Sequence, residues 1–311
     1  NYNTNGNIGS KGVYVYSLTL NKGTGVATVT GAGSYIGGRV VTITATVSTG
    51  YNFKAWTGAS TATTASTTIT IPTSSASSYA LTATATTNAN TYTVNYNGNG
   101  ATSGSTASST HTYNVAKALT ANGFARAYTV TFNANGGSVS TASLTANYTF
   151  DGWAESASGA KVYNDKQSVT NIATSGTKTL YAHWVSASVT LSTPSRTGYT
   201  FAGWYTAETG GTKIGDAGAS YTPTAGITLY AHWNITSHTV TYNATENGGS
   251  FGSQSGYSST ASVSYDAAVD LSKTNRYGTK SGWTFVGWNT NKDATTALSS
   301  LKMGTSNITL Y

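Results

Sequence analysis

An aromatic motif recurs along this chain, and it constrains the fold more than any other feature. In the two complete copies, a GW tryptophan is followed roughly 30 residues later by a closing HW tryptophan. The pairs are YTFDGW at 148–153 with TLYAHW at 179–184, GYTFAGW at 198–204 with TLYAHW at 228–233, and WTFVGW at 283–288 with ITLY at 308–311. Motifs that return at a fixed interval indicate one folding unit copied in series. The sequence therefore predicts a tandem array of small domains.

Other segments extend the array toward the N-terminus. GYNFKAW at 50–56 and YALTATA at 79–85 are variants of the two motifs. Three similar segments open a unit, each with strand-like alternation before a turn: TYTVNYNGNG at 91–100, YTVTFNANGG at 128–137 and HTVTYNATENGG at 238–249. We therefore divide the chain into an N-terminal extension, 1–11, and four repeats, 12–88, 91–184, 185–234 and 238–311. The chain begins without Met and stops within a motif, so we interpret it as a mature fragment of something longer.

The position of one block disturbs this order. Between Trp184 and Trp204 there is no room for an opening segment, whereas the stretch before Trp153 contains two. Either the third repeat takes its first strand from residues 128–147, inside the second repeat, or this inserted block is misplaced in the sequence and belongs after Trp184. We favour misplacement, because threading of one segment through another is rare.

Composition indicates a mostly β fold. Charged residues make up 8% of the chain, aromatic residues 12%, and 22 of the 311 residues are Tyr. Thr, Val and Tyr suit pleated, half-buried strands. We expect tandem small β-grasp-like domains of antiparallel strands, with at most one short helix at 116–123, where AKALTANG ends in a glycine. The sequence contains no run of apolar residues long enough to predict a transmembrane helix.

The cysteine content excludes one kind of chemistry, and the charge distribution narrows the classes of binding partner. The chain has no Cys, which excludes disulfides and thiol chemistry. Its net charge is +7, but the basic residues are scattered rather than clustered. We therefore expect no nucleic-acid partner, because no Lys/Arg run could follow a phosphate backbone. Scattered positive charge allows only loose attraction to anionic polymers or membranes.

These motifs resemble the Listeria–Bacteroides repeat, the B repeat of internalin-type surface proteins. The third repeat carries TPSRTGYTFAGW at 193–204 and TLYAHW at 228–233, whereas the second lacks the Pro and the Gly before Tyr148. The first resembles the divergent form of this repeat, and the fourth has Trp283 in place of Tyr and lacks the final A-x-W. The resemblance implies a β-grasp-like unit found in tandem in extracellular, bacterial surface-attached proteins, with no catalytic residues to transfer.

The motif aromatics are candidates for the centre of each core. Their number and fixed spacing favour a structural role, since small domains need large buried side chains when disulfides are absent. The predicted core residues are Phe53, Trp56, Phe150, Trp153, Trp184, Phe201, Trp204, Trp233, Phe285 and Trp288. The alternative is an aromatic platform for sugar rings. Loop tyrosines are better candidates for exposed ligand contacts, namely Tyr113, Tyr163, Tyr205 and Tyr221.

No constellation of residues predicts catalysis, a metal site or a cofactor. His183 and His232 occupy equivalent positions without acidic or His partners nearby in sequence, and His111 and His238 are isolated. The nine acidic residues recur at no motif position, so a glycosidase pair or a calcium loop is not predicted. Lys178 and Lys213 lie near Asn residues, so the sequence does not decide whether Lys–Asn isopeptide crosslinks form.

Two functions from different classes follow. The first is a non-enzymatic extracellular scaffold: a tandem-repeat stalk, or a filament-forming surface protein that associates with itself or with neighbouring repeats of a longer chain. The second is a module that binds carbohydrate or a host surface through exposed tyrosines. We favour the scaffold and expect no enzymatic activity.

Overall fold

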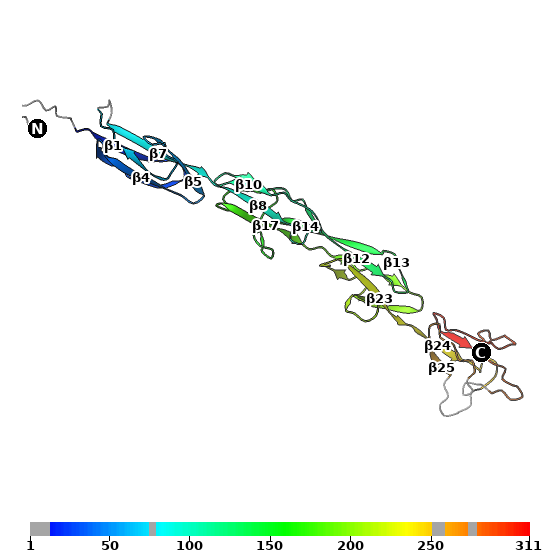
Figure 1. Cartoon of the computed structure of the whole chain (residues 1–311). Coiled ribbons are helices and arrows are strands. Elements are labelled where there is room, and N and C mark those ends of the chain that lie inside the picture. Colours follow the sequence, from blue (N-terminus) through cyan, green and yellow to red (C-terminus); the bar gives the residue numbers. More distant parts are fainter. Residues whose placement is uncertain (1–12, 75–78, 251–258, 273–278) are drawn as a thin grey trace, which may run out of the picture. The chain divides into compact units, whose positions relative to one another are not determined.

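The computed structural model describes residues 13–74, 79–250, 259–272 and 279–311 (Figure 1). Within these ranges every regular element is a β-strand, as the composition predicts, and there is no helix. Four separate hydrophobic cores define four repeats. The described chain forms two compact units, the first made of repeats 1 and 2 and the second of repeats 3 and 4. The N-terminal extension, 1–11, lies outside the described residues.

Repeat 1 has two sheets, with strand orders β3-β1-β7-β5 and β2-β4-β6. Its strands are β1 (Val15–Lys22), β2 (Val26–Thr30), β3 (Gly33–Ile36), β4 (Val40–Val47), β5 (Tyr51–Gly58), β6 (Ser66–Thr70) and β7 (Ala80–Ala89). Alternation along β4 places Val41, Ile43 and Ala45 in the core. The opening strand β1 pairs with the closing strand β7 in parallel, and β5 pairs with β7 in the antiparallel direction.

Repeat 2 is built in a similar way around its opening strand β8 (Thr91–Asn97), which pairs in parallel with the closing strand β17 (Gly176–Val185). Tyr92 and Val94 alternate with more exposed residues and enter the core. The other strands of this repeat are β9 (Ser103–Gly104), β10 (Ser109–Thr112), β11 (Lys117–Ala118), β15 (Lys161–Tyr163) and β16 (Ser168–Val169), together with parts of β12 (Phe124–Asn133) and β14 (Ser143–Ala154).

Repeat 3 pairs its opening strand β12 (Phe124–Asn133) in parallel with the closing strand β23 (Ile227–Ile235). The GW strand β20 (Tyr199–Tyr205) pairs with β23 in the antiparallel direction. Its remaining strands are β13 (Ser138–Val139), β14 (Ser143–Ala154), β18 (Val189–Thr190), β19 (Pro194–Ser195), β21 (Lys213–Gly215) and β22 (Ser220–Tyr221).

Strands β12 and β14 each serve two repeats. The start of β12 pairs with β9 of repeat 2, at Phe124 and Ala125, and its end pairs with β23 of repeat 3. On β14, Ala146 lies in the core of repeat 3 and Trp153 in the core of repeat 2. The chain thus leaves repeat 2, forms the opening hairpin of repeat 3 and returns. In the given order of the sequence, the third repeat thus takes its first strand from the block 128–147, and misplacement of this block stays a prediction.

Repeat 4 has fewer strands in its described part. Its opening strand β24 (Ser237–Tyr242) pairs with β25 (Thr260–Ser264) and, in parallel, with β26 (Ile308–Leu310). The segment 283–288, which corresponds to the GW strands of the other repeats, is not assigned as a strand. Trp288 is nevertheless buried, with Val240, Tyr242, Met303 and Leu310.

The short helix expected at 116–123 is absent, and this corrects the sequence prediction. Lys117 and Ala118 form β11, paired with Val169 and Ser168 of β16. Leu119 is buried in the core of repeat 2, and its N–H donates to the carbonyl of Gln167. Burial of Leu119 and the backbone hydrogen bonds of this ladder outweigh the helical preference of Lys, Ala and Leu.

Candidate functional site: aromatic cores and repeat junctions

The GW tryptophans lie at the centres of the four cores. Trp56, Trp153, Trp204 and Trp288 are each at most 1% exposed. The phenylalanine three residues earlier contacts each of them, with ring centroids 4.9–6.0 Å apart, at Phe53, Phe150, Phe201 and Phe285. Burying one such aromatic removes about 150–250 Å² from water, which stabilises the fold by roughly 4–6 kcal/mol as an upper bound.

Not every predicted core aromatic is fully buried. Phe53, Phe150 and Phe201 are half-buried and pack against their cores. Phe285 is 37% exposed, which differs from the prediction that it is a core residue.

The closing tryptophans connect the last strand to the opening turn by a hydrogen bond from the indole to a turn carbonyl. The Trp184 indole donates to the carbonyl of Gly98 at 2.9 Å, and the Trp233 indole donates to Ala134 at 3.0 Å. Both side chains are half-buried, and each ring meets the phenylalanine of its repeat edge-on at 5.5–5.7 Å. Each tryptophan therefore packs at the edge of its core and satisfies a turn carbonyl.

The Asn-rich opening turns are held in the same way in repeats 2 and 3. Asn99 and Asn135 both adopt a φ of 47°, in the left-handed region that Asn tolerates better than most residues. Their side-chain amides donate to the carbonyls of Ala182 and Ala231 on the closing strands.

A cation caps each opening turn. Arg126 donates to the carbonyl of Asn99 at 3.4 Å, Arg196 to Asn135 at 3.3 Å, and Lys280 to Asn247 at 2.9 Å. The Arg196 guanidinium also lies 3.9 Å from the centre of the Tyr199 ring, and Lys280 lies 4.4 Å from the Trp283 ring. These contacts give the basic residue of the repeat motif a structural role.

A polar network covers one surface of repeat 2. Asp151 accepts hydrogen bonds from Lys161 at 3.0 Å and contacts His183 at 3.1 Å. Glu155 pairs with Lys178 at 3.0 Å and accepts from the Tyr163 hydroxyl at 2.9 Å. Such partly exposed ion pairs contribute little to stability individually.

The network shifts three pKa values. The Lys161 hydrogen bond lowers the pKa of Asp151, and the Lys178 hydrogen bond lowers that of Glu155, with Tyr163 adding to it. Burial, followed by the bond to Glu155, raises the pKa of Tyr163 to about 12. Both carboxyls are therefore held ionised, whereas a general acid needs a raised pKa.

The histidines occupy unrelated environments. His183 contacts Asp151, whereas His232 stacks on Tyr205 at 3.9 Å and hydrogen-bonds the carbonyl of Ala207. His111 is buried, stacks on Tyr92 and contacts the Ser109 hydroxyl at 2.9 Å. Burial, followed by the charge of Lys117, lowers the pKa of His111. In the described part of the chain no three His, Asp or Glu side chains gather in a way that could hold a metal ion.

The two lysines considered for isopeptide bonds face carboxylates. Lys178 pairs with Glu155, and Lys213 pairs with Asp216 at 2.7 Å. The described residues also include no helix of the length and apolarity that a membrane span requires.

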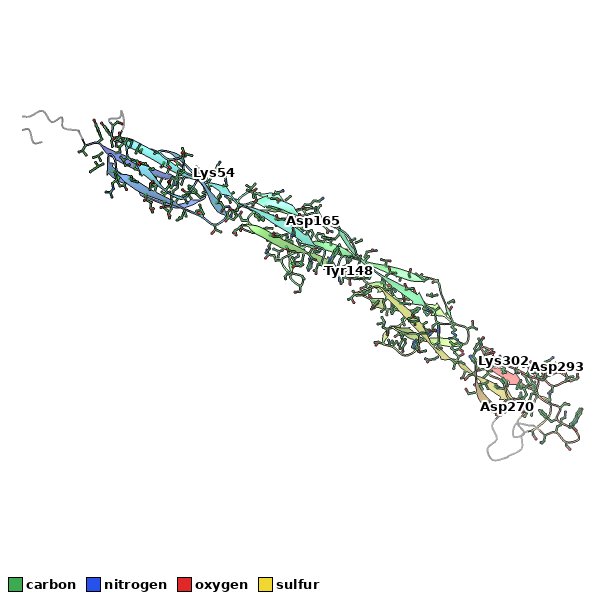
Figure 2. All side chains as sticks on the ribbon, in the orientation of Figure 1. Lys54, Tyr148, Asp165, Asp270, Asp293 and Lys302 are labelled. Carbon is green, nitrogen blue, oxygen red and sulfur yellow. The ribbon has the colours of Figure 1, made fainter. Side chains whose placement is uncertain are left out.

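The four tyrosines predicted as exposed contacts are all half-buried. Tyr163 and Tyr221 pack against the cores of repeats 2 and 3, and Tyr205 stacks on His232. Tyr113 contacts Tyr51 of the preceding repeat, with ring centroids 5.6 Å apart in a T-shaped arrangement. The structure does not bring these four tyrosines together into one surface. Tyr148, labelled in Figure 2, donates to the carbonyl of Pro223 and contacts Tyr128.

The contact at Tyr113 belongs to a junction between repeats 1 and 2. Asn90 lies between the two repeats, and its N–H donates to the carbonyl of Gly50 at 2.8 Å. Its own carbonyl accepts from the N–H of Tyr113 at 2.8 Å. Gly50 has a φ of 84°, and a Cβ at this position would overlap the Tyr113 ring. Glycine is required here by the backbone and by the neighbouring repeat together.

The same junction joins repeats 3 and 4. Thr236 donates through its N–H to Gly198 at 2.9 Å, and its carbonyl accepts from the N–H of Tyr265 at 2.8 Å. The rings of Tyr199 and Tyr265 are 6.2 Å apart, and a Cβ on Gly198 would overlap the Tyr265 ring. Sequence reasoning missed these junctions, although the Gly-Tyr pairs at 50–51 and 198–199 were a signal for them.

Comparison with known proteins identifies the repeats. Residues 128–183, 186–232 and 238–311 match the Listeria-Bacteroides repeat domain, and residues 16–89 match the divergent InlB B-repeat domain. The chain belongs to the Listeria-Bacteroides repeat family. The family match treats 128–183 as one continuous repeat, whereas the structure assigns Val130, Phe132 and Ala146 to the core of repeat 3.

Two relatives show the same likeness over part of their length. Internalin H of Listeria monocytogenes serovar 1/2a (strain ATCC BAA-679 / EGD-e) is 38% identical over 120 residues, which cover 38% of this chain and 19% of that protein. A protein of Evansella cellulosilytica described as a Gly-rich membrane protein is 31% identical over 133 residues, covering 38% of this chain and 14% of its own length. The chain thus spans less than a fifth of either relative. No solved structure matches it. The family matches and the likeness to internalin H identify a tandem-repeat protein built from Listeria-Bacteroides repeats.

Proposed function

We propose that this chain is a non-enzymatic, extracellular structural scaffold: a stalk whose repeats are fastened to one another. The observation that carries this proposal is the repeated junction. Asn90 and Thr236 each make the same two backbone hydrogen bonds, one to a Gly in the preceding repeat and one from a Tyr in the following repeat. A junction that recurs with its ring contact and its required glycine suits a protein that must hold adjacent repeats together.

The chemistry of the surface supports the absence of catalysis in this proposal. Asp151 and Glu155 are the carboxylates with the richest set of polar partners in repeat 2, and each is bound by a lysine. Their pKa values are lowered, so each serves as an ion-pair partner rather than as a proton donor near neutral pH.

The test is imaging of the native bacterial surface by electron microscopy, with antibody against this chain. A stalk predicts isolated strings of beads projecting from the surface. Regular polymers would indicate a filament subunit. Antibody label found only on protein released into the medium, and not on the cells, would contradict a surface stalk. A glycan array run in parallel addresses carbohydrate binding. Saturable binding abolished by Tyr221→Ala, with the fold intact, would favour a binding module instead.

A further inference from the structure

Repeat 3 carries an open hollow of about 340 Å³, bordered by its opening turn, its closing strand and the loop 206–212. This volume falls within the roughly 300–1,000 Å³ of small-molecule sites. The hollow combines a carboxylate, a guanidinium, an amide and aromatic rings, which come from Asn135, Arg196, Tyr199, Glu208, His232 and Trp233. All six residues lie within the described part of the second compact unit.

The loop that carries Glu208 is held in place from two sides. The Asn135 side-chain amide donates to the backbone carbonyl of Glu208 at 3.1 Å. The His232 Nε2 lies 3.0 Å from the carbonyl of Ala207, and because a carbonyl only accepts, this nitrogen carries the proton and donates. A loop fixed in this way loses little conformational freedom when a ligand binds.

The two charged groups that border the hollow do not pair with each other. The Arg196 guanidinium lies 3.9 Å from the centre of the Tyr199 ring and donates to the carbonyl of Asn135. Within the ranges that the structure describes, the Glu208 carboxylate has no ion pair or hydrogen bond, and Arg196 has no carboxylate partner. A guanidinium has five N–H donors, so acceptor and donor capacity both remain beside one space.

Repeat 2 has the same backbone frame without the carboxylate. There the Asn99 amide donates to the carbonyl of Ala157, as the Asn135 amide does to that of Glu208. Ala157 therefore occupies the position of Glu208, and its methyl group is no hydrogen-bond acceptor. Since the frame forms with Ala at this position, the fold of the loop does not require the Glu208 carboxylate, which stays available to a ligand.

We propose that this hollow binds a neutral hexopyranose unit of a polysaccharide through two adjacent hydroxyl groups. One hydroxyl donates to the Glu208 carboxylate, and its neighbour accepts from the Arg196 guanidinium. The Trp233 indole is half-buried, with its N–H bonded to the carbonyl of Ala134, and its ring offers apolar surface to the C–H face of the sugar. Glu208 would repel a second carboxylate, which assigns a neutral sugar rather than a uronic acid. The site adds a ligand to one repeat and does not depend on the stalk function.

The test uses the full chain labelled with nitrogen-15 and three probes: methyl β-D-glucopyranoside, methyl β-D-galactopyranoside and methyl α-D-mannopyranoside. We expect at least one probe to give saturable shifts of the Glu208 and Gly210 amides and of the Trp233 indole. Glu208→Ala, which places the residue of repeat 2 in repeat 3, should weaken that probe roughly tenfold or more. Asp216→Ala is the matched control, because it removes another exposed carboxylate of repeat 3 outside the hollow, and it should leave the affinity unchanged.

Arg196→Lys tests the second contact while the turn stays capped. In repeat 4 a lysine, Lys280, already caps the opening turn through the carbonyl of Asn247. The substitution should therefore keep repeat 3 folded, which the unchanged amide spectrum of the remaining residues would show. It should still weaken the sugar severalfold, because an ammonium group does not replace the fixed fork of a guanidinium.

Three outcomes would overturn the proposal. The first is no saturable shift with any of the three glycosides at about 100 mM, where a millimolar site is nearly saturated. The second is equal affinity of the unsubstituted chain and Glu208→Ala, which would remove the carboxylate from the site. The third is tighter binding of methyl β-D-glucuronide than of the glucoside, strengthened further by Glu208→Ala, which would assign the hollow to an anionic ligand held by Arg196.

Discussion

The rings of Tyr51 and Tyr113 meet edge to face, 5.6 Å apart, although the two residues belong to different repeats. Gly50 makes this contact possible, because its missing Cβ leaves room for the Tyr113 ring. The same relationship returns at Tyr199 and Tyr265, beside Gly198. Tyr113, a candidate for ligand contact from the sequence, therefore joins neighbouring repeats.

Replacing Gly50 with Ala should weaken the first junction. The substitution places an L-residue at a φ of 84° and pushes a methyl group into the Tyr113 ring. Backbone strain alone costs about 1–2 kcal/mol, and the overlap adds to it. Gly176→Ala is the matched control, since Gly176 has a φ of 71° with nothing within 4 Å of its Cβ position. Chemical denaturation should show a larger loss for Gly50→Ala, and equal losses would contradict a packing role for Gly50.

Substitution by Phe should destabilise the protein more at Trp204 than at Trp153. Both are fully buried, but the Trp204 indole donates to the carbonyl of Ser192 at 2.8 Å, whereas the Trp153 indole nitrogen is buried without a hydrogen-bond partner. Trp204→Phe should therefore reduce the free energy of unfolding by about 1 kcal/mol more than Trp153→Phe. Urea titrations of the two variants measure the difference. A larger loss of unfolding free energy for Trp153→Phe than for Trp204→Phe would contradict a stabilising role for the Trp204 hydrogen bond.

Acid should weaken repeat 2 through Asp151. Its pKa in the folded state lies below the unfolded value of about 3.9, chiefly because Lys161 hydrogen-bonds the carboxylate. The ionised group therefore stabilises the fold above that unfolded value, and this contribution is lost as the pH falls through the lower folded pKa. Urea midpoints measured between neutral and strongly acidic pH should fall less steeply for Asp151→Asn. Identical pH profiles would show that the network does not couple to folding.

The interlock of repeats 2 and 3 makes a covalent prediction. Because β12 and β14 each run through two repeats, the polypeptide must continue from Ala127 to Tyr128 and from Asn147 to Tyr148. Peptide mass spectrometry should find both junctions intact. A peptide in which Ala127 is followed directly by Tyr148 would instead show that the block 128–147 is misplaced in the sequence.

Local pattern predicted the elements that depend on local chemistry. Alternation located β8, with Tyr92 and Val94 buried, and the spacing of the GW motifs located Trp153 and Trp204. The Asn-Gly signals correctly placed the opening turns, where Asn99 and Asn135 take left-handed backbone conformations.

Features that depend on distant partners could not be predicted in this way. Lys117 and Ala118 have helical preference, but their partners in β16 lie far along the chain. Tyr113 was expected to be exposed because nothing in its own segment shows that Tyr51 covers it. Phe285 was expected to be buried because its motif is shared, yet it is 37% exposed in repeat 4.

The central claim, that the junctions hold adjacent repeats in a fixed relationship, is tested most directly by a distance between repeats 1 and 2. The chain has no Cys, so Thr42→Cys and Thr177→Cys, at exposed positions in β4 and β17, accept spin labels without background. Double electron–electron resonance should give one narrow distance distribution. Tyr113→Ala should broaden it, while Tyr181→Ala, a half-buried tyrosine in β17 away from the junction, should not. A broad distribution in the unsubstituted chain, or one that Tyr113→Ala leaves unchanged, would contradict the account.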